Sequence, residues 1–121
     1  MKKRWVILRH TLLRDTLDGL HFDLLVEDQT SCRSWRLDQF PVLNGPLIAA
    51  KFISPHNLYW LDRDESPVSG NRGWAKRVAG GTFMGSLPSE KFDCLLIEIH
   101  SNDLSGLLKI ENHFCQLLPC T

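Results

Sequence analysis

The sequence predicts an all-β fold: one domain, residues 1–121, forming a small closed antiparallel β-barrel of about eight strands with at most short helical turns. Three observations predict this fold class. Short stretches alternate between apolar and polar residues, as half-buried strands do. Turn-forming residues separate these stretches. No segment keeps a helical period long enough to form a packed helix.

Size and composition limit the possible functions. The chain has 121 residues, 43% of them hydrophobic, which is enough for one domain with a real core. Lysine plus arginine equals aspartate plus glutamate at 14 each, so no overall basic charge favours nucleic acid. The first apolar run is too short for a signal peptide, and no run approaches a membrane span. We expect a cytoplasmic, monomeric protein without a membrane partner. Its four cysteines lack C-x-x-C spacing, which favours free thiols.

The stretch HFDLLVE organises the chain, because strict alternation divides it into two faces. One face carries Phe22, Leu24 and Val26 and is an ordinary core face. The other carries His21 and Asp23, two positions apart, or about 6–7 Å along one side of a strand. From there both side chains can reach one metal ion or one phosphate. The alternative is a solvent face with ordinary polar residues.

A first strand, expected over residues 4–10, precedes this stretch across a polar loop. We expect the two strands to pair antiparallel with His10 opposite His21 and Leu8 opposite Asp23. The two imidazoles and the carboxylate then lie on one face. The loop is too long to determine this register by its own turn geometry, so the pairing is a hypothesis.

The remaining strands are expected as short stretches between segments of turn-forming residues. Gly80-Gly81 predicts a hairpin turn, and the polar, glycine-rich segment 62–73 predicts a loop. Strands are expected at residues 32–38, 47–53, 56–61, 74–78, 82–84, 92–100, 104–110 and 115–118.

Several motifs in order resemble one family, the 3′-phosphoesterase domain of bacterial DNA ligase D. HFDLLVE followed by SWRL resembles its H-[YW]-D-x-[RM]-L-E … [ST]-W segment, and His56-Asn57-Leu58 resembles its D-H-P-L segment. The run from SPVSGNRG to GGTF resembles its E-G-x-[IV]-x-x-G-x-x-G … G-T-[WY] run, in a form most similar to stand-alone bacterial relatives. The match covers roughly residues 4–110.

The resemblance implies a closed β-barrel enzyme that trims 3′ ends of DNA or RNA, removing a terminal ribonucleoside or a 3′-phosphate. It implies a divalent metal, manganese first and zinc second, held by His10, His21 and Asp23. It also implies that His21, Asp23 and His56 are catalytic and that His56 contacts the phosphate. Nucleic acid 3′ ends, and DNA-repair proteins, are the implied partners.

The chain departs from the family at two positions of the site. Leu25 stands where the enzymes have an arginine, and Trp60 stands where they have a tyrosine, with Tyr59 beside it. The spacing between His10 and His21 is also longer than in the family. Loss of an arginine fork removes charge-assisted hydrogen bonds of about 1.5–3 kcal/mol. We therefore expect activity weakened or redirected relative to the family.

Three further interpretations stay open. Arg72, in SGNRG, is a candidate phosphate-binding residue that replaces the missing charge; the alternative is an ordinary turn with a solvated arginine. The barrel could also be a non-catalytic module that binds nucleic acid or protein, or a phosphoesterase for a small phosphorylated molecule. Zero net charge suits the last of these.

The four tryptophans could stack on bases, but a small barrel more commonly buries them. His100 and His113 match no motif and are expected at the surface.

Overall fold

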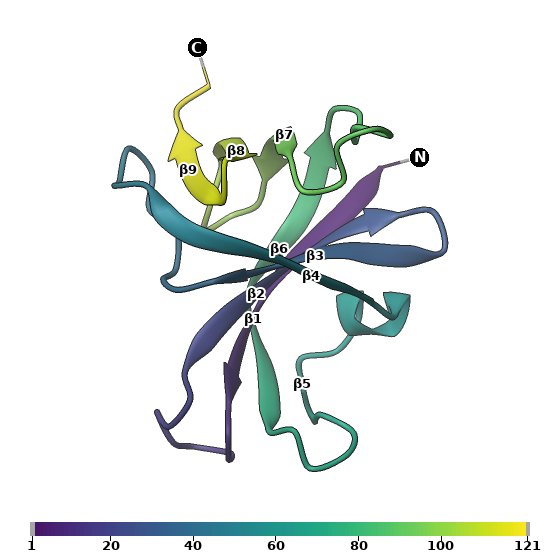
Figure 1. Ribbon diagram of the computed structural model, residues 1–121, viewed down its shortest axis with the longest axis vertical. Helices are drawn as coiled ribbons and strands as arrows, with labels where there is room; N and C mark the ends of the chain where they lie inside the picture. The colour runs from purple at the N-terminus through teal and green to yellow at the C-terminus, as the bar shows by residue number, and fades with distance from the viewer. Residues whose placement is uncertain (1, 121) are drawn as a thin grey trace.

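The computed structural model describes residues 2–120 and contains one antiparallel sheet of nine strands (Figure 1). The strand order is β1-β2-β3-β4-β9-β8-β7-β6-β5, and pairing of β1 with β6 closes eight strands into a barrel, with β5 outside on β6. The closed antiparallel β-barrel predicted from the sequence is confirmed. The strands are β1 Lys3–Thr11, β2 His21–Asp28, β3 Ser31–Leu37, β4 Ile48–His56, β5 Glu65–Pro67, β6 Trp74–Met84, β7 Leu95–His100, β8 Gly106–Glu111 and β9 Phe114–Leu118.

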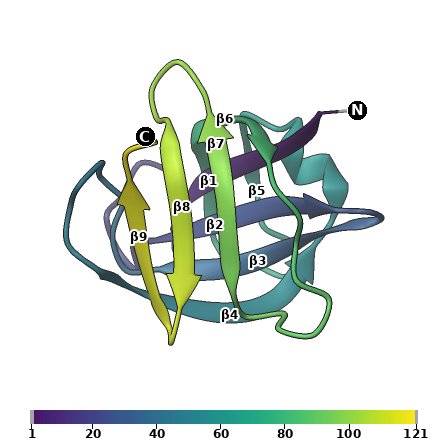
Figure 2. The same cartoon turned by 90° about the horizontal axis from the view of Figure 1, so that it is seen from above.

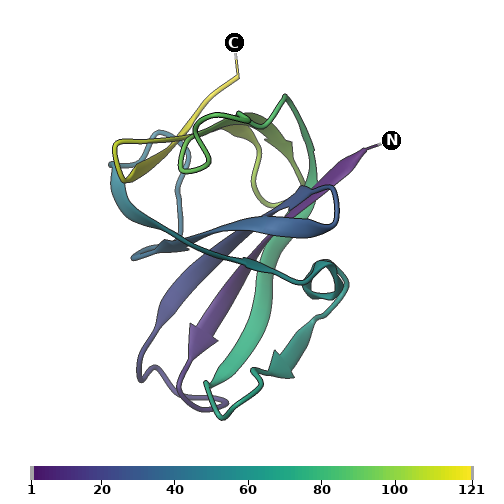
Figure 3. The ribbon, with the colours of Figure 1, turned by 45° about the vertical axis from the view of Figure 1, so that its right-hand side comes forward.

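Two layers make up the barrel. Strands β7, β8 and β9 cross steeply over β1–β4 (Figure 2). The ends of β1, β2 and β6 extend away from the β7–β9 layer, with β5 and the helical turn η1, Leu58–Leu61, beside them (Figure 3). This extension is where the first two histidines lie, at the end of β1 and the start of β2.

The predicted register of the first two strands is confirmed. His10 lies opposite His21, and Leu8 lies opposite Asp23. In the next ladder, Asp23 lies opposite Arg36 of β3. The two imidazoles and the carboxylate therefore share one face of the sheet, as the alternation predicts.

Both faces of β1 and β2 are buried, against two separate hydrophobic clusters. Leu24 faces the barrel interior, and its neighbour Leu25 faces the opposite side. The barrel core consists of Trp5, Ile7, Leu24, Val26, Trp35, Leu37, Ile48, Ala50, Ala79, Phe83, Leu95, Ile97, Ile99, Leu108, Ile110, Cys115 and Leu117. The second cluster consists of Val6, Leu8, Leu25, Cys32, Trp60, Leu61 and Ala75. Trp5, Trp35 and Trp60 are thus packing residues rather than exposed stacking platforms.

The strand predicted over residues 56–61 is wrong in the structure. Strand β4 ends at His56, and the chain then turns into η1, a single turn of 3₁₀-helix. The Asn57 side chain caps this turn by accepting a hydrogen bond from the Tyr59 amide at 3.0 Å. The turn points Trp60 and Leu61 into the second cluster, and burial of those two adjacent side chains outweighs the strand preference of this aromatic stretch.

The hairpin predicted at Gly80-Gly81 is also wrong, because β6 runs without a break from Trp74 to Met84. Both glycines pair with β1, after a register shift that lies opposite Ile7 and Leu8. A Cβ on Gly81 would lie 1.9 Å from the His100 carbonyl oxygen. This glycine therefore permits close approach of backbones rather than a turn.

Smaller corrections concern the segments around β6. The predicted loop 62–73 includes the short strand β5, and β7 begins at Leu95, three residues later than predicted. Within residues 2–120 the only helix is η1, and none there is long and apolar enough to cross a membrane.

All four cysteines are free, as predicted. Burial raises the pKa of Cys32 to about 11 and that of Cys115 to about 12. Thiols with such pKa values remain protonated at neutral pH, so these two cysteines are packing residues rather than nucleophiles.

Candidate metal centre

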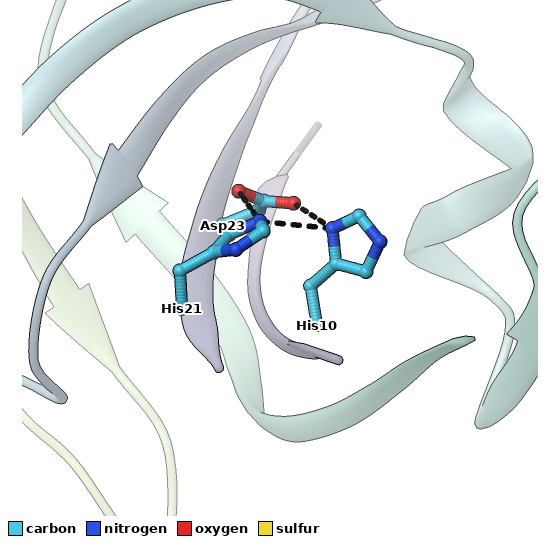
Figure 4. A group of neighbouring side chains, drawn as sticks. All are labelled: His10, His21 and Asp23. Carbon is cyan, nitrogen blue, oxygen red and sulfur yellow. Dashed lines mark hydrogen bonds and ion pairs between the residues drawn. The ribbon is translucent and has the colours of Figure 1, made fainter. Parts of the chain in front are cut away.

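Three side chains from two neighbouring strands converge at the extended end of the sheet (Figure 4). They are His10, His21 and Asp23, and one ligand atom from each lies within 4.8 Å of the others. His10 Nδ1 is 2.8 Å from His21 Nε2. Each of these nitrogens is 3.5 Å from a carboxylate oxygen of Asp23. The structure therefore brings together the residues that the resemblance implies as metal ligands.

The outer nitrogens of both imidazoles are held by backbone carbonyls. His10 Nε2 is 2.8 Å from the Arg72 carbonyl oxygen, and His21 Nδ1 is 3.1 Å from the Gly19 carbonyl oxygen. Carbonyls only accept hydrogen bonds, so these outer nitrogens carry the ring protons. In the neutral rings, the two inner nitrogens then point lone pairs at each other. Only a proton or a cation between the two inner nitrogens makes this arrangement favourable. A backbone carbonyl on the outer nitrogen is also the usual second-shell contact of a metal-ligating histidine.

The Asp23 carboxylate adds a possible oxygen ligand that receives no hydrogen bond from the part of the protein that the structure describes. Its residue is 4% exposed, and among the described residues its Oδ1 atom has no hydrogen-bond partner. A buried carboxylate oxygen without a partner is unfavourable. The nearest guanidinium nitrogen, Arg36 Nε, is 4.0 Å away, beyond hydrogen-bonding distance. A bound cation would satisfy this oxygen.

The two imidazoles differ in their tendency to hold a proton. Hydrogen bonding to Asp23 raises the pKa of His10, whereas burial lowers the pKa of His21. In the metal-free protein a shared proton therefore resides on His10. A metal must displace it, so metal binding releases a proton where His10 is charged.

The donor set fits the predicted metals. Two neutral imidazoles and one carboxylate suit manganese or zinc, and three protein ligands leave positions open for water and substrate. In this set His10 and His21 would supply nitrogen and Asp23 would supply oxygen.

Gly73 permits the carbonyl contact that orients His10. Its φ of +113° is in the region that favours glycine. A Cβ on it would lie 2.2 Å from the Thr11 carbonyl oxygen and 2.9 Å from His10 Nε2. Only glycine lets the chain after Arg72 pass close to both groups.

His56 lies at the end of β4, on the wall of a cavity of about 560 Å³ that the three candidate ligands also line. Its Nδ1 is 2.8 Å from the Ser34 hydroxyl, which donates its own proton to the Cys32 carbonyl oxygen. Ser34 must therefore accept from His56, so Nδ1 carries a proton and Nε2 of the neutral ring carries a lone pair. Burial lowers the pKa of His56, which favours that neutral form.

The two positions that depart from the family are packing positions here. Leu25 is fully buried and Trp60 is 7% exposed, both within the second cluster. Tyr59 lines the cavity and stacks on Trp60, with ring centroids 4.9 Å apart. Tyr59 is therefore the aromatic residue of this turn with a hydroxyl group on the cavity lining.

Arg72 also lines the cavity, but its guanidinium is engaged within its own turn. Nε donates to the Ser69 carbonyl at 2.8 Å, and Nη2 donates to the Ser69 hydroxyl at 3.1 Å. Its phosphate-binding role stays a prediction. The contribution that the structure assigns to this residue is its carbonyl, which holds His10.

Sequence reasoning missed two features of the site. The carbonyls of Gly19 and Arg72 carry no side-chain signal, and their positions depend on loop conformation. Arg36 could have been found, because it shares a strand face with Ser34 and its ladder partner is Asp23. His100 and His113 are exposed, as predicted.

Comparison with known proteins adds no assignment: no protein-family model matches the chain, and no curated protein matches it significantly.

Proposed function

We propose that this protein is a metal-dependent phosphoesterase that acts on 3′ ends of DNA or RNA, like the family that its motifs resemble. Removal of a 3′-phosphate or a terminal ribonucleoside is the proposed reaction, in the cytoplasm and alongside DNA-repair proteins. The observation that carries the proposal is the convergence of His10, His21 and Asp23, within 4.8 Å of one another, beside a cavity lined by His56.

The proposed chemistry is hydrolysis of a phosphate ester. For a 3′-phosphate, a bond forms between water oxygen and phosphorus, the bond from phosphorus to the 3′ oxygen breaks, and a proton given up by the water is replaced by one on the leaving 3′ oxygen, which becomes a hydroxyl. For a terminal ribonucleoside, the bond from phosphorus to its 5′ oxygen breaks instead, and that oxygen becomes the hydroxyl. A divalent ion, when bound, polarises a phosphoryl oxygen and lowers the pKa of water. His56 is neutral near pH 7 with its Nε2 lone pair free of the Ser34 contact, so it can accept the proton.

One observation favours a second candidate, a phosphoesterase for a small phosphorylated molecule. The net charge is zero, and several arginines are paired with acidic residues rather than left to contact phosphates. A protein that follows a nucleic acid strand normally carries a basic surface along it. The buried Leu25 favours a third candidate, a non-catalytic binding module, since the family arginine is absent.

Metal titration with matched variants tests the proposal. We expect Mn²⁺ to bind with a stoichiometry of one, measured by electron paramagnetic resonance of free Mn²⁺. Asp23→Asn and His21→Ala should weaken binding by more than about 100-fold, beyond the loss typical of outer-shell changes. His100→Gln, which changes an exposed histidine, is the control. Absence of both Mn²⁺ and Zn²⁺ binding would contradict the proposal and favour the binding module.

Substrate comparison separates the two enzymatic candidates. Phosphate release should be measured from a 3′-phosphorylated primer and from a small aryl phosphate, with and without Mn²⁺. The leading proposal expects release from the primer that is lost in Asp23→Asn. Release from the aryl phosphate alone would favour the small-molecule enzyme.

A further inference from the structure

Arg36, near the end of β3, places a guanidinium on the wall of the cavity beside the candidate metal centre. It lies opposite Asp23 in the β2–β3 ladder and is 45% exposed. Among the described residues its one ion-pair neighbour is Asp23 Oδ1, and that 4.0 Å separation is too long for a hydrogen bond. Its fork of N–H donors is therefore available to a ligand.

Three other arginines, including the second one that lines the cavity, Arg72, are used by the fold. Arg33 donates to Asp28 and to the Pro88 carbonyl. Arg77 donates to the Leu61 carbonyl, and Arg72 donates to Ser69. Arg36 differs from them because its side chain contributes no such bond to a turn or a loop.

Neutralising the negative charge of Asp23 does not explain the position of Arg36, because the two imidazoles lie closer to that carboxylate. The inner nitrogens of His10 and His21 are each 3.5 Å from the carboxylate, nearer than Arg36 Nε. The carboxylate is thus directed at the imidazoles, and Arg36, which also lines the cavity, makes no hydrogen bond to it. Arg36 and His56 both line this cavity, so an anion bound there has a guanidinium and an imidazole among its neighbouring residues.

We propose that Arg36 binds the terminal phosphate of the substrate through paired N–H donors inside this cavity. Guanidinium and phosphate match in geometry, and charge-assisted pairs of this kind are stronger than neutral hydrogen bonds. The inference deepens the proposed function and rests on it for the choice of a phosphate ester as ligand. It assigns the phosphate to a residue of β3 rather than to the SGNRG turn.

Nuclear magnetic resonance of arginine side chains tests this assignment directly in a chain of 13.9 kDa. Inorganic phosphate is titrated into the ¹⁵N-labelled, metal-free protein with a chelator present, and the Nε–H signals are followed. The Arg36 signal should shift and saturate, and Arg36→Gln should weaken binding by about ten- to hundredfold. Arg36→Lys keeps the charge without the fork and should give an intermediate loss.

Two comparison variants make the result specific. Arg63→Gln alters an arginine that lies over the Tyr59 ring and should bind phosphate like the wild type. Arg72→Gln should have a smaller effect than Arg36→Gln. An unmoved Arg36 signal, or equal affinity in Arg36→Gln and wild type, would overturn the inference.

The failure of this inference and that of the proposed function are distinguishable. Mn²⁺ binding is measured separately, and Arg36→Gln should not weaken it, because Arg36 is not a candidate ligand and removing its positive charge from beside Asp23 favours a bound cation. If the wild type binds no metal, the proposed phosphoesterase function is contradicted. If phosphate binds equally well with and without the Arg36 side chain, only the proposed phosphate subsite is contradicted.

Two sources of the phosphate are compared with the same signal. A 3′-mononucleotide and a short 3′-phosphorylated oligonucleotide should both move Arg36, and the tighter of them identifies the source. The same oligonucleotide with a 3′-hydroxyl is the negative control. An equal shift with this control would overturn the assignment to a terminal phosphate.

Discussion

The two faces of β1 and β2 carry different kinds of buried structure. The barrel core is enclosed by strands on every side and is made of apolar residues. The second cluster is covered by η1 and the segment around Val68, and it adjoins His10, His21 and Asp23 on the same strands. The comparison indicates that the rigid barrel positions the site, while the thinner layer leaves room for a cavity.

Two adjacent leucines test this difference in enclosure. Leu24 and Leu25 are both fully buried, but they face the barrel core and the second cluster respectively. We expect Leu24→Ala to lower the free energy of unfolding by about 4–5 kcal/mol and Leu25→Ala by about 2–3 kcal/mol, because a cavity under a short turn can collapse. Urea unfolding measures both. An equal or larger loss at Leu25 would show that the second cluster is as rigid as the barrel.

Two glycines with left-handed φ test how the loops support the site. Gly73→Ala adds a Cβ that clashes with Thr11 and His10, whereas Gly70→Ala meets only the Arg72 side chain at 3.7 Å. Both should lose about 1 kcal/mol from backbone strain, and Gly73→Ala more. Only Gly73→Ala should also weaken Mn²⁺ binding, by about 10–100-fold, because the Arg72 carbonyl moves off His10. Equal metal affinities in the two variants would contradict this support.

The smallest expected effect is a pH dependence of the unfolding free energy that originates from His56 on the cavity wall. Burial lowers the pKa of His56 below its usual 6.5, so between that value and the lowered one the unfolded chain binds more protons. His56 therefore makes stability fall as pH falls below about 6.5, by at most about 1.4 kcal/mol per pH unit. The difference in unfolding free energy between wild type and His56→Gln, measured with a chelator from pH 7.5 to 5, should shrink or reverse towards acid. A difference that stays constant would contradict a buried neutral His56.

Much of the site was predictable because strand alternation and pairing are local rules. The positions of His10, His21 and Asp23 on one face, and the register that joins them, follow from two alternating stretches. The helical turn at Leu58–Leu61 was not predictable, since its apolar and aromatic residues are also typical of a strand and the Asn57 cap and the packing of Trp60 decide its conformation.

Other features depend on distant chain segments. The close approach of Gly81 to the His100 carbonyl requires the β6–β7 pairing to be known first, so a glycine pair was interpreted as a turn. The burial of Leu25 depends on η1 covering that face. From the sequence, Arg36 resembles any half-exposed strand residue. Its place beside the site is known only from its pairing with Asp23 in the β2–β3 ladder.

Burial on both sides of β1 restricts where the chain can change length. The run from Trp5 to Leu8 is buried throughout, alternating between the two clusters. A single inserted residue between Leu8 and His10 would turn the imidazole towards the barrel interior. An insertion in the exposed loop before Gly19, whose carbonyl holds His21, would leave both ligands in place. The distance along the chain between the first two histidines can therefore change without a change in the donor geometry.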